Sequence, residues 1–411
     1  MKIIGKGQLI RGFIFACTNK TEAECFERLL FGTDRVYAPI VIRIRKGDLL
    51  FLNNLESNTL YGVFKAVSNS DMNIQSDAWN GKYLYQVKVE ALGEKVALKN
   101  ARRIFKKFQI KRNTPILGRE LINFLNLFLP NPLLNTNSEL DKLTHFISEQ
   151  KEKITERIDE IDIEKEIPLV EATTLWDFPR QSYGLTLKGN NKYPGVTPAL
   201  IIFNLVWRYT DLSDLVVDPM CGSGTTIDVC KEEKREVVGL DISPPSDRSD
   251  IIQSDARKIP VRDCFADMVF IDSPYGDNIR YNEHPACIGK ISSETGKFYD
   301  ELEKVMRESH RILKEGKVLG WLIGDQWVKD KFTPVGLKIY NRLCKYFKPI
   351  DIISITRRGQ SSHTGLWFNR ARRFNFFLRG FKYLLIMRKS SKEQSSTRKP
   401  RKIEWAYYER E

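Results

Sequence analysis

The sequence lacks several features that would assign it to particular classes of protein. Its seven cysteines are an odd number and include no C-x-x-C pair, which argues against a zinc cluster or a disulfide framework and favours reduced thiols in a cytoplasm. No apolar run reaches the roughly 18 residues that a membrane span needs, and the first residues contain no apolar core of a signal peptide. We therefore expect a cytoplasmic protein that holds no metal.

Acidic residues are also in short supply. The chain has 52 Asp and Glu against 66 Lys and Arg, so its net charge is +14. A surplus of this size favours a polyanionic partner, most often nucleic acid, although a merely basic soluble protein is the alternative. With 42% hydrophobic and 11% aromatic residues the chain can build packed cores, and 411 residues suggest two or three domains.

Residues 1–112 are predicted to form a small α+β domain. Apolar runs bounded by Gly, Asn and Lys occur at 11–18, 46–54 and 59–67, and residues 83–92 alternate with a period of two, as strands do. The pattern at 20–32 predicts a helix, with Thr21 as its N-cap and Gly32 as its end.

The stretch 101–112 is basic and contains no acid, with Phe105 and Phe108 between the charges. Two interpretations are open. The stretch can clamp a nucleic-acid backbone and offer an aromatic ring for stacking. Alternatively, its phenylalanines face a core and its charges are solvated.

The rest of the chain divides into three further segments. Residues 113–165 are predicted to be a helical connector, because charged residues alternate with apolar ones at helical spacing. From 166 to 390, apolar strand candidates alternate with helices, which predicts a doubly wound, mostly parallel α/β sheet that ends in two strands joined at Arg379-Gly380. Residues 391–411 form a basic tail.

One loop in the α/β segment is glycine-rich. The stretch "VVDPMCGSGTTIDVC", residues 216–230, predicts a strand, a turn through Gly222 and Gly224, and a helix that begins near Thr225. In such sheets ligands bind at the carboxyl ends of the strands. A phosphate-binding loop would need a lysine after the glycines, and a dinucleotide fingerprint would need a third glycine where Ile227 stands. S-adenosylmethionine, a cation without phosphate, is the remaining ligand class.

Aspartates at successive strand ends favour that cation. Asp218, Asp241 and Asp255 each follow a predicted strand, and three carboxylates would repel a pyrophosphate. We expect Asp241 to receive the ribose hydroxyls and Asp255 the adenine amino group, although strand-end aspartates are also common turn and cap residues. The predicted cofactor-binding residues are Asp218, Pro219, Cys221, Gly222, Gly224, Thr225, Asp241, Ile242, Asp255 and Ala256.

A second motif follows about fifty residues later. Asp272, Ser273, Pro274 and Tyr275 form a polar corner with an aromatic after the fourth strand. The pair "DPMCGSGTT" and "DSPY" resembles the motifs of nucleic-acid amino-methyltransferases, which methylate N4 of cytosine or N6 of adenine. The resemblance covers residues 170–390 and implies S-adenosylmethionine as the cofactor, a Rossmann-like fold and no metal.

The resemblance also implies catalytic roles. The exocyclic amine is a poor nucleophile, and Asp272 with the carbonyl of Ser273 would accept its N–H groups and free its lone pair. Tyr275 would stack on the base after that base has left its helix. Ser273 stands where the family has a proline, and Tyr193 and Thr197 replace the histidine and lysine of an upstream motif at 192–201. The target base therefore stays open.

Two further segments bear on the substrate. Residues 10–92 resemble the DCD domain, which is similar in fold to PUA and YTH modules that commonly bind RNA; packing on the enzyme or binding a protein is the alternative. At 356–380, arginines alternate with Trp367, Phe368, Phe374 and Phe376. Such a patch suits the rim of a base-flipping pocket, unless its aromatics belong to the core.

Taken together, these patterns favour an S-adenosylmethionine-dependent methyltransferase that acts on an exocyclic amine in nucleic acid, with structured RNA preferred to DNA. A DNA N4-cytosine or N6-adenine methyltransferase is the alternative within the class. A non-catalytic RNA-binding protein that keeps the fold is the alternative from another class.

Overall fold

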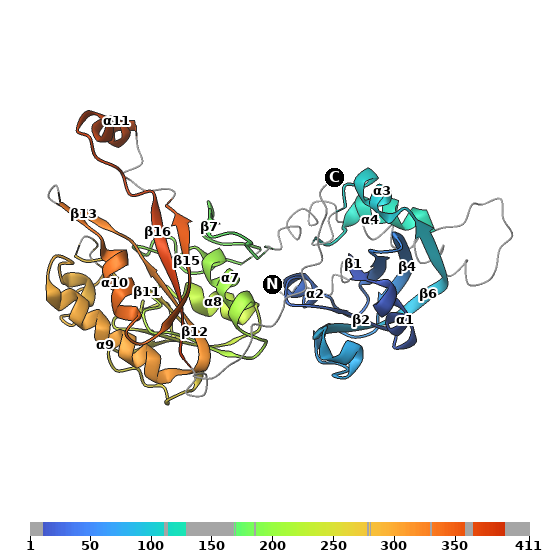
Figure 1. Ribbon diagram of the computed structural model, residues 1–411, viewed down its shortest axis with the longest axis horizontal. Helices are drawn as coiled ribbons and strands as arrows, with labels where there is room; N and C mark the ends of the chain where they lie inside the picture. Colours follow the sequence, from blue (N-terminus) through green and yellow to red (C-terminus); the bar gives the residue numbers. More distant parts are fainter. Residues whose placement is uncertain are drawn as a thin grey trace, which may run out of the picture. The chain divides into compact units, whose positions relative to one another are not determined.

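The structure is a computed structural model, and it describes residues 11–110, 114–128, 168, 170–184, 186–277, 279, 281–328, 331–357 and 365–390. The chain falls into two compact units (Figure 1). The first ends at Glu171, and the second begins at Ala172, apart from Ser182–Leu187, which groups with the first. Residues 129–165 of the predicted helical connector and the tail at 391–411 lie outside the described residues.

The first unit is built on a curled six-stranded sheet in the order β1-β3-β4-β6-β2, with β5 beside β6. Strands β1 and β3 are parallel, and the other neighbours are antiparallel. The predicted strands are confirmed, since Tyr85, Val87 and Val89 of β6 are buried on alternate positions. The bounds are β1 Gly12–Cys17, β2 Leu30–Thr33, β3 Leu49–Asn54, β4 Thr59–Ala66, β5 Asp71–Met72 and β6 Tyr85–Lys99.

The helices of this unit are short. They are α1 Asn19–Glu27, α2 Ala38–Val41, α3 Ala101–Lys107 and α4 Gly118–Leu125, with 3₁₀ turns η1 Ala78–Gly81 and η2 Asn126–Phe128.

The helix predicted at 20–32 is shorter and starts earlier than expected. It begins after Thr18, because the hydroxyl of Thr21 accepts a hydrogen bond from the Thr18 amide at 3.0 Å, so Thr21 is not the N-cap. Gly32 does not end it. Leu29 takes a left-handed φ of 46° and turns the chain, and the following residues form β2 against β6. Burial of Phe31 in the core outweighs the helical spacing here.

The basic stretch after β6 takes the second of its two interpretations. Phe105 and Phe108 pack against the core of the first unit, and the ring of Phe108 lies 6.2 Å from that of Phe124 in an edge-on contact. These rings are partly buried and contribute to the core of the first unit. The exposed charges of α3 are Arg102, Arg103, Lys106 and Lys107.

The first unit extends beyond residue 112, the boundary that the sequence suggested. Helix α4 lies in the segment assigned to the connector, yet Leu121 and Phe124 are fully buried against Phe51 of β3. An amphipathic helix of this kind is held by its apolar face, and local spacing does not say which core that face will meet.

The second unit contains an eight-stranded sheet in the order β10-β9-β8-β11-β12-β16-β15-β7. The neighbours from β10 to β12 are all parallel, and β16 is antiparallel to both β12 and β15. A separate hairpin, β13–β14, follows β12. The bounds are β7 Leu175–Trp176, β8 Leu215–Asp218, β9 Glu236–Asp241, β10 Ile251–Gln253, β11 Ala266–Asp272, β12 Leu313–Ile323, β13 Gln326–Val328, β14 Lys331–Thr333, β15 Lys348–Thr356 and β16 Phe381–Arg388.

Helices cover both faces of this sheet (Figure 1). On one face Ile271 and Trp321 pack with Met306 of α9 and with α10 in one apolar cluster. On the other face Gly320 lies against Leu205 of α7. Central parallel strands are buried on both sides, which is why they read as continuous apolar runs. The helices are α7 Ala199–Tyr209, α8 Thr225–Glu232, α9 Gly296–Ile312, α10 Val335–Leu343 and α11 Gly365–Arg373, with a 3₁₀ turn η3 Ile288–Lys290.

The expected final pair of strands joined at Arg379-Gly380 is wrong. Only its second half is a strand, β16, whereas residues 374–380 are irregular and follow α11. Asn375 has a left-handed φ of 52°, which breaks the extended run, and Phe374 and Phe377 are exposed rather than paired into the sheet. The partners of β16 are instead β12 and β15.

Among the described residues, the structure contains no helix with the length and apolar character that crossing a membrane requires.

The packing of α4 generates a stability prediction. Phe124→Ala should destabilise the first unit by about 3–5 kcal/mol, because a fully buried ring in contact with Phe51 at 4.8 Å is replaced by a cavity. Hydrogen exchange of peptides from β3 and β4 in urea measures this. Val36→Ala, at a side chain that is 63% exposed, is the control and should change stability by less than about 0.5 kcal/mol. Unchanged protection in Phe124→Ala would contradict the assignment of α4 to this core.

Candidate active site

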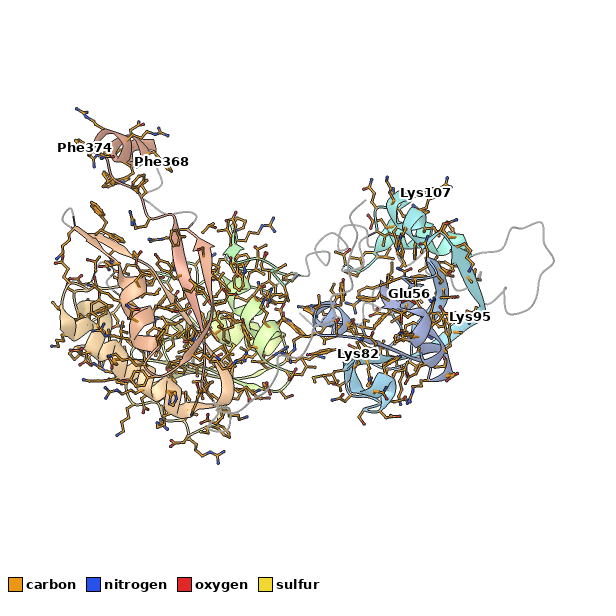
Figure 2. The ribbon with its side chains drawn as sticks, in the orientation of Figure 1. Glu56, Lys82, Lys95, Lys107, Phe368 and Phe374 are labelled. Carbon is orange, nitrogen blue, oxygen red and sulfur yellow. The ribbon has the colours of Figure 1, made fainter. Side chains whose placement is uncertain are left out.

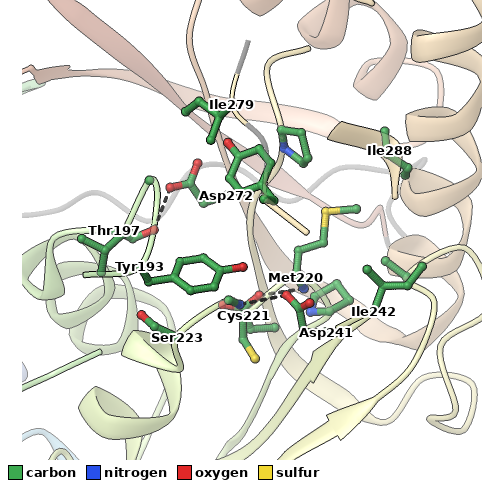
Figure 3. A pocket seen from close by; sticks show the side chains of 18 of the residues that line it. Tyr193, Thr197, Met220, Cys221, Ser223, Asp241, Ile242, Asp272, Ile279 and Ile288 are labelled. Atoms are coloured by element: carbon green, nitrogen blue, oxygen red, sulfur yellow. Dashed lines mark hydrogen bonds between the residues drawn. The ribbon is translucent and has the colours of Figure 1, made fainter. Parts of the chain in front are cut away.

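Four carboxylates lie at the carboxyl ends of four neighbouring strands in the second unit. Asp218 ends β8, Asp241 ends β9, Asp272 ends β11, and Asp255 follows β10. All four line one pocket of about 250 Å³ (Figure 3). Parallel strands bring their carboxyl ends to the same edge of the sheet, and this edge is where such sheets bind ligands.

Most of the residues predicted from the sequence line this pocket, and Gly224 and Ser273 do not. Gly224 is the N-cap of α8. Ser273 is buried behind the lining, where its hydroxyl accepts a hydrogen bond from the indole of Trp321 at 3.0 Å. The predicted residues that line the pocket are Asp218, Pro219, Cys221, Gly222, Thr225, Asp241, Ile242, Asp255, Ala256, Asp272, Pro274 and Tyr275.

The two glycines of the loop are required by their protein neighbours as well as by any ligand. Both have left-handed φ angles, 51° at Gly222 and 85° at Gly224. A Cβ at Gly222 would stand 2.8 Å from the ring of Tyr193. At Gly224 it would collide with the guanidinium of Arg248.

Arg248 clamps the loop from outside the pocket. Its guanidinium donates to the carbonyl of Ser223 at 2.8 Å and forms ion pairs with Asp228 at 3.0 Å and Asp250 at 2.8 Å. The contacts with Ser223 and Asp228 are partly buried, whereas the contact with Asp250 is exposed to solvent. Sequence reasoning did not find this residue, because the two partners that link it to the loop and to α8, Ser223 and Asp228, lie 25 and 20 positions away along the chain.

Asp218 is almost completely buried beneath the loop. It accepts hydrogen bonds from the amide of Met220 at 3.0 Å and from the hydroxyl of Thr226. Burial raises its pKa to about 7, and the neighbouring carboxylates of Asp272 and Asp241 add to the rise, whereas the two hydrogen bonds oppose it. A cation in the pocket would stabilise the charged form.

Asp241 ties the loop to β9. One carboxylate oxygen accepts the amide of Gly222 at 3.1 Å, and the other accepts the amide of Ser243 at 2.9 Å. Burial raises the pKa of this carboxyl, although the two amide hydrogen bonds oppose the rise. Because each carboxylate oxygen has two lone-pair positions, capacity remains for two further donors from a ligand.

Asp255 has a protein partner that the sequence did not reveal. The guanidinium of Arg257 binds its carboxylate through two nitrogens, the shorter contact being 2.6 Å, and also pairs with Glu301 of α9 at 2.6 Å. The carboxylate is therefore held in one orientation. A ligand amino group that contacts Asp255 would use the lone pairs that Arg257 leaves free.

Asp272 lies in a separate part of the pocket from Asp241 (Figure 3). Thr197 points toward Asp272, and its hydroxyl donates to one carboxylate oxygen at 2.7 Å. The hydroxyl of Tyr275 donates to the other at 3.1 Å. Tyr275 is only 6% exposed, so the structure gives it a hydrogen-bonding role beside Asp272, and its stacking on a base stays a prediction.

Sequence reasoning missed a basic residue in this half of the pocket. The ammonium of Lys382 lies 3.8 Å from a carboxylate oxygen of Asp272 and 5.1 Å from the ring centre of Tyr275. Burial lowers the pKa of Lys382, and Asp272 opposes that effect. A lysine within the apolar run of β16 was the available signal. Tyr281 and Arg357 also line the pocket, the latter from the basic stretch at 356–380.

The N-terminal residues match a known family. Residues 11–113 match the profile described as the Development and cell death domain, as the motifs at 10–92 predicted. The first unit therefore contains a DCD domain. Its likeness to PUA and YTH modules stays a prediction.

Two curated plant proteins share this part of the chain. The DCD domain-containing protein NRP-A of Glycine max is 40% identical over 77 residues, which are 19% of this chain and 21% of that protein. The DCD domain-containing protein NRP of Arabidopsis thaliana is 29% identical over 137 residues, 30% of this chain and 38% of that protein. The chain thus spans about a fifth to two fifths of the length of these relatives.

Solved structures resemble this chain weakly. TrmN from Thermus thermophilus has a TM-score of 0.33 at 12% identity and covers 48% of this chain and 51% of its own. A protein from Thermus thermophilus provisionally classed as a DNA modification methylase, in complex with S-adenosyl-L-methionine, has a TM-score of 0.25 at 24% identity and covers 36% and 57%. At these values the likeness does not bear on the function of this chain.

Burial of Asp218 generates a prediction about pH. Between its ordinary pKa of 3.8 and its folded pKa of about 7, only the folded state holds the proton, so stability falls as pH rises through that window. Asp218→Asn removes this titration. The stability of the native protein relative to the variant should therefore decrease from about pH 5 to about pH 8, by at most about 1.4 kcal/mol per pH unit. Urea unfolding followed by tryptophan fluorescence measures it, and parallel pH profiles would contradict the burial argument.

Proposed function

We propose that the second unit is an S-adenosylmethionine-dependent methyltransferase that acts on an exocyclic amino group of a nucleobase in nucleic acid, with structured RNA preferred to DNA. The observation that carries this proposal is the row of four carboxylates on neighbouring strand ends in one pocket. We call the part beside the glycine loop, with Asp218 and Asp241, the glycine-loop half, and the part around Asp272 the Asp272 half. The first half suits a cationic nucleoside, and the second suits a neutral amine.

The residues of the glycine-loop half fit the cofactor. Asp218 and Asp241 supply negative charge in a buried setting, where attraction to a sulfonium cation is strong. Asp241 retains lone pairs for two ribose hydroxyls, and the absence of a Cβ at Gly222 lets the ring of Tyr193, another lining residue, pack against the loop. When bound, the cofactor supplies an electrophilic methyl group.

The Asp272 half fits the amine. An exocyclic amine is a weak nucleophile because its lone pair is delocalised into the ring. Asp272 retains one lone-pair position on each oxygen beside the hydroxyls of Thr197 and Tyr275, so it can accept an N–H and draw the nitrogen toward tetrahedral geometry. The nitrogen gives up one proton as it gains the methyl group, and Asp272 is the group in place to accept it.

Charge supports a polyanionic substrate. The chain carries a net charge of +14, and Lys382 and Arg357 add positive charge to the Asp272 half of the pocket. The charge does not separate RNA from DNA. We favour RNA because the DCD domain resembles folds that commonly bind RNA, and because an unpaired base in a folded RNA reaches a pocket at little cost.

The first test of this proposal measures cofactor binding. Asp241→Ala should weaken the affinity for S-adenosylhomocysteine at least tenfold, because each hydrogen bond to a charged acceptor contributes about 1.5–3 kcal/mol. Titration calorimetry measures the affinity. Asp241→Asn is similar in size, keeps one of the two acceptor oxygens and should also weaken binding, whereas Asp247→Ala, at an exposed position of the following loop, should not. Native affinity in both Asp241 variants would remove the ribose assignment.

The second test measures methyl transfer. Asp272→Ala should lower the rate roughly a hundredfold or more while cofactor affinity changes only a few-fold, since the lost carboxylate faces the amine. Radiolabelled cofactor is incubated with total RNA and with genomic DNA from cells that lack the enzyme. Asp277→Ala, at an exposed side chain five positions on, is the matched control and should retain activity.

The substrates separate the rival functions. Label in RNA that depends on Asp272 supports the proposal. Label that enters only DNA replaces it with a DNA amino-methyltransferase. Binding of cofactor and RNA without any transfer replaces it with a non-catalytic RNA-binding protein.

A further inference from the structure

An aromatic cluster stands at the surface of the second unit, outside the pocket. It consists of Trp327 on β13, Phe332 on β14 and Phe376 in the segment after α11. The ring of Trp327 lies 6.5 Å from that of Phe376 with the planes 24° apart, and 6.4 Å from that of Phe332. Trp327 is 42% exposed and Phe332 is 43% exposed, so the cluster presents ring surface to solvent. We call these three residues the aromatic platform.

Arginine side chains accompany the platform. The guanidinium of Arg379 lies 5.1 Å from the ring centre of Phe332 and 5.9 Å from that of Trp327. Helix α11 comes shortly before Arg379 in the chain and has no buried residue. Phe368 on this helix and Phe374 directly after it are exposed (Figure 2). These exposures contradict the alternative that the aromatics at 356–380 belong to the core. The cations of α11 are Arg370, Arg372 and Arg373, and residues 365–390 contain no acid.

Two short stretches of chain connect the platform to the active site. Trp327 follows Gln326, whose side-chain amide packs against Gly276 directly after Tyr275 and accepts the hydroxyl of Ser293 at 2.6 Å. The second stretch leads into β16. Arg379 lies three positions before Lys382, and Lys382 lines the pocket. A substrate held in the pocket can therefore continue onto the platform.

Exposed rings among arginines suit unpaired nucleobases. Every base has a π face that stacks on an aromatic side chain, and arginine adds attraction to the phosphates and to the ring faces. Bases inside a duplex already stack on one another and offer no free face. The lack of acids opposes binding of a cationic partner and matches a polyanion.

We propose that the aromatic platform, with Arg379, binds unpaired bases that flank the target base, so that the substrate is presented as a single strand or a loop. This inference rests on the proposed function for the identity of the target, but binding by the platform is measured without catalysis. The experiment uses the full chain and fluorescence anisotropy with a labelled single-stranded RNA of about 12 nucleotides, within the range of known single-strand site sizes. A duplex of the same sequence is the comparison ligand.

The expected result has four parts. The native protein binds the single strand more tightly than the duplex. Trp327→Ala weakens single-strand binding between about fivefold and a hundredfold. Trp327→Phe, which keeps a stacking face, retains most of the affinity. Phe265→Ala is the matched control, because Phe265 is 41% exposed beneath Arg262 at 4.2 Å and precedes β11, at the opposite end of the strand from the pocket. This control should bind as the native protein does.

Equal affinities of Trp327→Ala and Phe265→Ala would overturn the inference, as would tighter binding of the duplex. Thermal unfolding and calorimetry with S-adenosylhomocysteine verify that Trp327→Ala is folded and has an intact cofactor half. The two proposals can fail separately. Platform-dependent binding of the strand without methyl transfer would leave the platform standing and remove the catalytic proposal, and transfer that is indifferent to Trp327 would do the reverse.

Discussion

The buried carboxylate of Asp218 is the constraint around which the pocket is arranged. A charge at the end of a central strand is unfavourable unless hydrogen bonds or a cation compensate it, and the loop that follows supplies the amide of Met220 and the hydroxyl of Thr226. To reach these positions the chain passes through left-handed conformations at Gly222 and Gly224. The loop is then locked from outside by Arg248 and from the next strand by Asp241. The protein itself thus supplies contacts that hold the loop.

The two halves of the pocket differ in their electrostatics, so they favour ligand groups of different charge. Among the described residues that line the pocket, no lysine or arginine lies beside Asp218 or Asp241. In contrast, the ammonium of Lys382 lies 3.8 Å from a carboxylate oxygen of Asp272. A cation is thus favoured in the first half. In the second half the charge of Lys382 balances that of Asp272, so this half does not require a cationic ligand and suits a neutral amine.

The surface beyond the pocket continues this division. Arginines and exposed rings gather on α11 and the aromatic platform. Both α11 and Arg379 lie in the stretch of chain just before Lys382. The first unit offers a different surface, since Phe105 and Phe108 pack against its core and the exposed charged residues of α3 are basic. The base stacking that we propose is therefore assigned to the second unit, where α11 and the aromatic platform expose their rings.

The sequence by itself determined the strand-and-loop frame of the site. Apolar runs ending in Asp218, Asp241 and Asp272, and the glycines between them, are local patterns, and each reappears at the predicted strand end. Only the tertiary structure decided which side chains meet there. Thr197 reaches Asp272 across 75 positions, and Arg257 joins Asp255 to Glu301, which lies 44 positions further along the chain. Lys382 arrives from the far end of the chain because β16 inserts between β12 and β15. The same holds for α4 and for residues 374–380, whose local patterns suited more than one partner. Spacing along a chain records which face of an element is apolar, but the partner of that face is chosen by long-range packing, which no local pattern encodes.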